Sequence, residues 1–100
     1  MAAGLIWTAR AEDEVLGLLD YVRLSSPMYA QAVAARFETR AEKLCDFPGQ
    51  GRRLPDYDGP REVREVFVYR WRMIYEVAPG KVTILAILHG ARLIENAPPL

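Results

Sequence analysis

The chain has 100 residues, of which 51% are hydrophobic and 26% charged, a composition typical of one small folded domain and not of a disordered chain. Thirteen basic and thirteen acidic side chains cancel, so the overall charge does not favour nucleic acid, and only a local basic patch could bind it. The single cysteine excludes an internal disulfide, and no signal-peptide pattern or membrane-length apolar run is present, so we expect a cytoplasmic protein.

The first half of the chain predicts one strand followed by two helices. Leu5–Trp7 is a short apolar run with the character of a strand. Thr8 can cap a helix over about Ala9–Leu24, and Ser26 with Pro27 can open a second helix that ends near Asp46. The connection is tight, so the two helices should form an antiparallel hairpin. Apolar residues recur at helical spacing at Val15, Leu18, Leu19 and Val22, and then at Ala30, Val33, Ala34, Phe37, Ala41 and Leu44.

Residues 47–60 have a different composition, with three prolines and three glycines. This predicts a loop without regular structure, and a loop of this length in so small a domain is often functional. Strand character returns over residues 61–68. Residues 91–100 end in Pro98 and Pro99 and are expected to form a short frayed tail. The whole chain, residues 1–100, is expected to be one domain.

Residues 69–89 predict a β-hairpin, because apolar and polar side chains alternate on both sides of Pro79-Gly80, a pair that suits a type II turn. With those two residues as the loop, Ala78 pairs with Lys81, and the register continues through Tyr75–Ile84 and Trp71–Leu88 to Arg70–His89. A slip by one residue would exchange the faces. The expected faces are Trp71, Met73, Tyr75 and Val77 with Val82, Ile84, Ala86 and Leu88, and Arg70, Arg72, Ile74 and Glu76 with Thr83, Leu85, Ile87 and His89.

The predicted order is β-α-α-β-β-β, with a helical hairpin on a mostly antiparallel sheet, which is the α+β class. The helices are expected to cover the Trp71–Leu88 face and to bury Trp71 and Tyr75 in the core. The opposite face is expected to be open. Its apolar residues, Ile74, Leu85 and Ile87, could then receive a helix or strand of a partner.

The sequence has no metal-ligand spacing, no phosphate-binding glycine loop and no nucleophile elbow, so we expect neither a metal nor a cofactor. Cys45 is expected to be a buried free thiol. Arginines could hold phosphate, and with His89 they could support RNA cleavage by 2′-hydroxyl attack. They could equally be solvated or paired with carboxylates such as Glu62, Glu65 and Glu76, and residue types alone favour that simpler reading. The arginines concerned are Arg52, Arg53, Arg64, Arg70, Arg72 and Arg92.

Several short motifs, in order and spacing, make nearly the whole chain similar to the RelE/ParE superfamily of toxins from bacterial type II toxin–antitoxin modules. The resemblance implies a β-α-α-β-β-β fold and a small antitoxin whose C-terminal segment wraps the toxin in a hetero-oligomeric complex. The motifs are Trp7-Thr-x-x-Ala11 with Asp13, Phe47-Pro48-x-x-Gly51-Arg52, Val63-Arg64-Glu65, Tyr69-x-x-Arg72-x-x-Tyr75 and Leu88-His89-Gly90-Ala91-Arg92.

The family divides by target. RelE-like members cleave mRNA on the ribosome, and by position the resemblance would make Arg64, Arg72, His89 and Arg92 the catalytic set. ParE-like members inhibit DNA gyrase, and this branch is favoured because the chain lacks a lysine pair near Arg64, a tyrosine after Tyr75 and a C-terminal helix. A third hypothesis is an inactive homologue that only binds the antitoxin. Candidate residues for binding antitoxin or target are Arg70, Arg72, Ile74, Leu85, Ile87 and His89.

Overall fold

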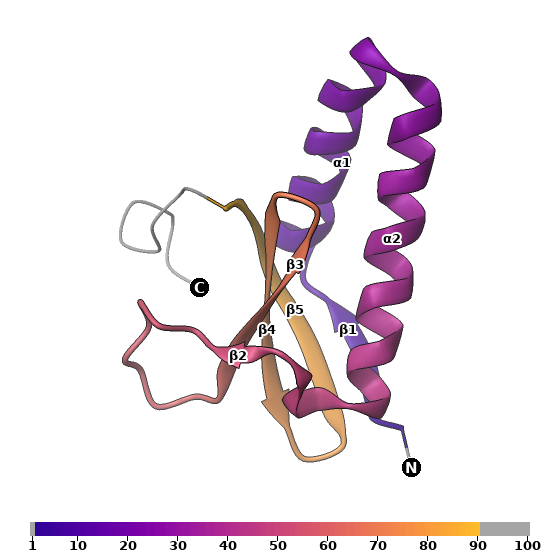
Figure 1. Ribbon diagram of the computed structural model, residues 1–100. Coiled ribbons are helices and arrows are strands. Elements are labelled where there is room, and N and C mark those ends of the chain that lie inside the picture. The colour runs from indigo at the N-terminus through magenta and orange to yellow at the C-terminus, as the bar shows by residue number, and fades with distance from the viewer. Residues whose placement is uncertain (1, 91–100) are drawn as a thin grey trace.

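The computed structural model describes residues 2–90 and places two helices on one face of a β-sheet (Figure 1). Within these residues five strands form one sheet in the order β1-β5-β4-β3-β2. The pairs among β2, β3, β4 and β5 are antiparallel, and β1 lies parallel to β5. The predicted α+β class is confirmed, and the predicted order β-α-α-β-β-β is found with one further short strand, β2, after the helices. The elements are β1 Gly4–Trp7, α1 Ala9–Ser25, α2 Pro27–Asp46, a 3₁₀ turn Pro48–Gln50, β2 Arg52–Arg53, β3 Val63–Val68, β4 Trp71–Ala78 and β5 Lys81–His89.

Both helices begin where the sequence predicts. The Thr8 hydroxyl accepts a hydrogen bond from the Ala11 amide, and the Ser26 hydroxyl accepts one from the Tyr29 amide. These caps satisfy amides that the first turn of a helix leaves without an intrahelical partner. One residue, Ser26, separates the helices, so they run antiparallel as a hairpin. The hairpin buries Ala11, Leu19, Val22, Ala30, Val33, Phe37, Ala41 and Leu44.

The β4–β5 hairpin has the predicted turn but only half of the predicted register. Gly80 has φ of +69°, as a type II turn requires, and the pairing is as predicted from Ala78–Lys81 to Tyr75–Ile84. A β-bulge then adds Leu85 to β5. Beyond it Trp71 lies opposite His89 instead of Leu88, while Arg70 belongs to the β3–β4 turn. The predicted pairs Trp71–Leu88 and Arg70–His89 are therefore wrong, because one extra residue shifts everything that follows.

The bulge also exchanges the faces of the last residues of β5. Ile87 packs in the core beneath the helices, whereas Ala86 and Leu88 belong to a second apolar cluster. The N-cap residue of α1 and one side chain within α1 satisfy the peptide groups that the bulge displaces. The Thr8 hydroxyl donates to the Leu85 carbonyl at 3.1 Å, and the Ile87 amide donates to a Glu14 carboxylate oxygen at 2.9 Å. The bulge is thus fixed by the first turns of α1.

The face of the sheet away from the helices is not open, contrary to the prediction. Leu54 and Tyr57 fold over it from the segment between α2 and β3. Ile74, Leu85 and Ile87 are 0%, 8% and 5% exposed, so none of them offers an exposed apolar surface. The predicted structureless loop over residues 47–60 also contains the 3₁₀ turn and β2. The second cluster comprises Leu54, Val63, Ile74, Leu85, Ala86 and Leu88, with Tyr57 packed against it.

Candidate functional site

Arg72 is the centre of a buried ion-pair network on the face of the sheet away from the helices. Its Nε donates to Glu65 at 2.6 Å, and its Nη2 lies 2.9 Å from Asp56. The Glu65 side chain is fully buried and also accepts a hydrogen bond from a second arginine, Arg52, at 2.6 Å. Burial by itself lowers the pKa of Arg72, but the hydrogen bonds and charges of Asp56 and Glu65 outweigh that effect and raise it above its usual value. Arg72 therefore ties the loop to the sheet.

The Arg64 side chain lies on the opposite face of the sheet, which the helices cover. It lies across from Tyr75, whose ring is part of the core beneath the helices. Its guanidinium donates to the Gly51 carbonyl and to Glu62, each at 2.8 Å. The Tyr75 hydroxyl donates to the Pro48 carbonyl at 2.7 Å and accepts from the Gly51 amide at 2.9 Å. Together these bonds hold the start of the loop against the end of the sheet.

His89 and Arg70 lie together at the other end of the helix-covered face, where β4 begins and β5 ends. They border an open hollow of about 560 Å³ between the sheet and the end of the helical hairpin. Trp71, which faces His89 across the strands, packs toward Phe37 at a ring distance of 6.2 Å. We call this the Arg70–His89 hollow. Its lining residues are Leu18, Tyr21, Val22, Ser25, Tyr29, Arg70, Trp71 and His89.

The residues expected to form a nuclease site are therefore not brought together. The sheet separates Arg72 from Arg64 and His89, and Arg64 lies at the loop end of the domain while His89 borders the hollow. Arg92 lies outside the described residues. Among the candidate binding residues, Arg70 and His89 are exposed, whereas Arg72, Ile74, Leu85 and Ile87 are buried.

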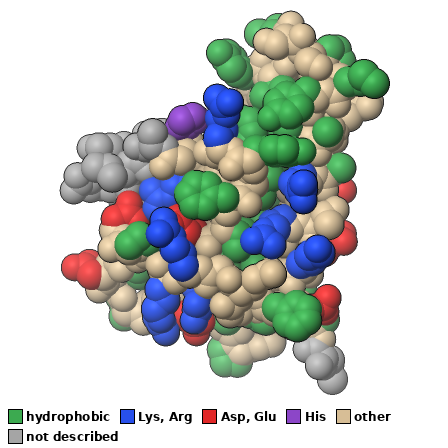
Figure 2. All heavy atoms as spheres, viewed as in Figure 1, with side chains coloured by type: hydrophobic (Ala, Val, Ile, Leu, Met, Phe, Trp, Pro, Cys, Tyr) green, Lys and Arg blue, Asp and Glu red, His purple; other side chains and the backbone are tan. Residues whose placement is uncertain are grey.

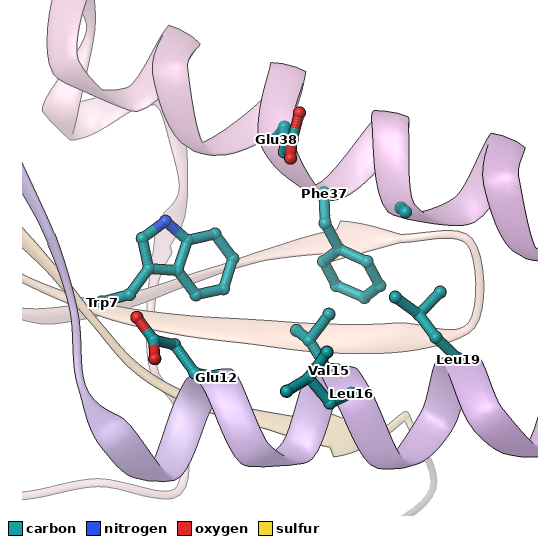
Figure 3. Close-up of a pocket in the computed structure, with 8 residues that line it drawn as sticks. Trp7, Glu12, Val15, Leu16, Leu19, Phe37 and Glu38 are labelled. Atoms are coloured by element: carbon teal, nitrogen blue, oxygen red, sulfur yellow. The ribbon is translucent and has the colours of Figure 1, made fainter.

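Two surface features were missed by the sequence analysis. One is an apolar pocket of about 410 Å³ between α1 and α2, where Trp7, Phe37 and Leu19 point toward one another (Figure 3). Glu12 and Glu38 lie at its rim. Large side chains exposed on a helix, such as Leu16, were the available signal.

The other missed feature is a polar groove of about 280 Å³ between α2 and the end of β3, which we call the α2–β3 groove. In Figure 2, Lys and Arg side chains gather over α2 on the face shown. The signal in the sequence was three basic residues at spacings of four and three, which a helix places on one side. The lining residues are Arg36, Thr39, Arg40, Lys43, Phe67, Val68 and Tyr69.

Residues 2–90 contain no group of three or more histidine, cysteine or carboxylate side chains placed to hold a metal ion. None of the helices in this range is long and apolar enough to cross a membrane. Cys45 has an intermediate exposure and forms no disulfide, and its thiol donates to the Ala41 carbonyl. Its expected full burial is thus only partly met.

Comparison with known proteins identifies the family. The model of the family described as the ParE toxin of type II toxin–antitoxin systems, parDE, matches residues 5–94. The chain belongs to the ParE toxin family. It is 37% identical over 92 residues to Toxin RelE2 of Caulobacter vibrioides, a match that covers 91% of this chain and 99% of that protein.

A solved structure described as the chromosomal ParDE TA system from P. aeruginosa has the same fold. The TM-score is 0.71 at 23% sequence identity, and the match covers 88% of this chain and 96% of that one. As a ParE family member, the chain is the toxin component of a type II toxin–antitoxin system, a class of proteins that act with an antitoxin partner. The predicted superfamily is confirmed.

Proposed function

We propose that this ParE family toxin inhibits DNA gyrase and is neutralised by a cognate antitoxin that binds it directly. The observation that carries the choice of target is the burial of Arg72. A nuclease would need this arginine open to phosphate, but Glu65 and Asp56 occupy its guanidinium. The balanced charge of the chain also fits a protein target better than ribosomal RNA. Family membership over residues 5–94 supports the same branch.

The Arg70–His89 hollow is the surface we propose for contact with the antitoxin or the target. Of the candidate binding residues, Arg70 and His89 are the two that a partner can reach without rearrangement of the core. The adjoining end of the helical hairpin exposes Tyr21, Leu24 and Met28, which are 76%, 86% and 82% accessible. Exposed apolar residues beside basic ones resemble the centre and rim of a protein interface.

The second candidate function is cleavage of mRNA on the ribosome. It is retained because the Caulobacter relative is named as a RelE toxin. In that case Arg70, which lines the same hollow as His89, would hold phosphate and His89 would move a proton. An inactive homologue that only binds the antitoxin is the third candidate. These three functions give different results in one experiment.

The experiment is induction of the toxin without any antitoxin, with plasmid supercoiling and mRNA integrity followed in the same cells. Gyrase inhibition predicts relaxed or linearised plasmid with intact mRNA, and the purified chain should block supercoiling by gyrase in vitro. Cuts in mRNA at codon-defined positions would instead support the nuclease. Continued growth with folded toxin present would exclude both toxic mechanisms.

Substitutions in the hollow test the proposed contact surface. The double variant Arg70→Ala/His89→Ala should lose toxicity or antitoxin binding while its thermal unfolding temperature stays near that of the unmodified chain. Arg53→Ala is the control, because Arg53 is also exposed but lies on β2. Full toxicity and antitoxin binding in the double variant would exclude the hollow as the contact surface.

A further inference from the structure

The β3 strand has an outer edge that the described residues leave partly uncovered. β2 pairs only with Arg64 and Glu65, so no strand within residues 2–90 pairs with the outer side of Val66–Val68. The carbonyl of Val63 points outward, since it accepts a hydrogen bond from the Leu54 amide. Peptide groups alternate along an antiparallel strand. The amide and carbonyl of Phe67, four residues further on, therefore also point outward.

This uncovered edge borders the α2–β3 groove, whose opposite wall is basic. Arg36, Arg40 and Lys43 line the groove from α2, and its described lining contains no carboxylate. In a chain with equal numbers of acidic and basic side chains, three cations on one wall are a local excess. An anionic ligand is thus favoured at this place by charge.

The end of the groove is shaped by an unusual turn residue. Tyr69 has φ of +53°, a conformation that is uncommon for a bulky side chain. Its ring packs edge-on against Tyr29 at 5.7 Å, and the Arg36 guanidinium lies 5.6 Å from the ring centre. These contacts fix the β3–β4 turn against α2 and hold Arg36 beside the strand edge. Strained backbone that the surrounding contacts maintain is common at binding sites.

From these three observations we propose that the α2–β3 groove binds an extended, acidic segment of a protein partner. The segment adds to the sheet beside β3 and exchanges backbone hydrogen bonds with Phe67. Its carboxylates lie against Arg36, Arg40 and Lys43. This is β-strand addition, in which the main chain provides affinity and the side chains provide selectivity. The inference does not depend on which target the toxin inhibits, because it concerns a surface separate from the Arg70–His89 hollow.

The probe is a capped eight-residue peptide in which glutamate alternates with valine, titrated into the full chain and followed by NMR. Its binding should shift the Phe67 amide signal and slow hydrogen exchange at that amide. The amides of Val66 and Val68 already face β4 and should change little. A peptide with lysine in place of glutamate is the charge control. Equal binding of the two peptides would overturn the proposal, as would unchanged exchange at Phe67.

Four variants separate the contribution of the basic side chains from that of the strand edge. Arg40→Glu should weaken binding of the acidic peptide about tenfold, which corresponds to about 1.4 kcal/mol. Arg23→Glu, the same change on the exposed part of α1, should leave it unaltered. Phe67→Pro removes the outward amide and the ring and should abolish binding, whereas Phe67→Ala, which removes the ring but keeps the amide, should retain it. Equal binding by the proline and alanine variants would refute strand addition.

A short DNA duplex tests the other class of anionic partner. We expect it to leave the peptide bound at 150 mM salt. Displacement of the peptide by DNA, with an affinity that falls steeply as salt rises, would overturn the proposal in favour of nucleic acid.

Discussion

Removal of Glu65 should destabilise the protein far more than removal of Arg52, the exposed arginine of the same ion-pair network. The Glu65 side chain is fully buried and bonded to Arg72, whose own side chain is 6% exposed. Glu65→Ala would remove one ion-pair partner from the buried Arg72 guanidinium, while the ion pair with Asp56 would remain. Breaking a buried pair by removing one partner costs about 3–5 kcal/mol. For a domain of this size that lowers the unfolding temperature by about 12–40 °C, at about 4–8 °C per kcal/mol.

Arg72→Ala should cost a similar amount, because it leaves Glu65 buried with Arg52, whose side chain is 63% exposed. Arg52→Ala is the control and should cost no more than about 1 kcal/mol, because Arg52 is exposed and Glu65 keeps its ion pair with Arg72. The double variant Glu65→Leu/Arg72→Met removes both buried charges and fills their volume. It should recover much of the loss, since apolar replacements of buried pairs are often neutral or stabilising.

Chemical denaturation of the four variants, monitored by circular dichroism, gives their free energies of unfolding relative to the unmodified chain. A cost below about 1 kcal/mol for Arg72→Ala would refute the structural role of this arginine, since buried pairs are worth more than that when broken. If Arg72→Ala then abolished toxicity in a stable protein while Glu65→Ala did not, Arg72 would have a direct functional role.

Two further predictions concern groups whose pKa the fold raises. Tyr75→Phe should cost about 1–3 kcal/mol in denaturation experiments, because the Gly51 amide and the Pro48 carbonyl lose their partner. Burial raises the pKa of Tyr75 despite the Gly51 hydrogen bond, so this group's stabilisation is present below the usual pKa of tyrosine and is lost as pH rises through the raised value. The unmodified chain should therefore lose stability at alkaline pH more steeply than Tyr75→Phe, and parallel pH profiles would contradict this. Burial, with nearby carboxylates, also raises the pKa of Cys45, so iodoacetamide should modify it more slowly than free cysteine at neutral pH, as mass spectrometry over time can measure. A rate equal to that of free cysteine would show that the thiol is not shielded.

The local features of the fold could be predicted from the sequence because they depend on neighbouring residues. Thr8 and Ser26 define the helix starts through hydrogen bonds to amides three residues away. Pro79-Gly80 defines the hairpin turn through the backbone angles that these two residues prefer. The order of elements and the tight helical hairpin follow from spacing alone, and they agree with the motifs that indicate the toxin superfamily.

The arrangement of the candidate site residues could not be predicted, because it depends on contacts between residues distant in the chain. The bulge at Leu85 is stabilised by Thr8 and Glu14, more than 70 positions away, and no local pattern in β5 reveals it. The loop covers the second face because Leu54 packs into the apolar cluster there and Asp56 forms an ion pair with Arg72. Arg72 thus changes from a candidate catalytic residue to a buried structural one. The sequence determines which charges exist, but only the tertiary structure decides which are buried against one another and which remain open to a partner.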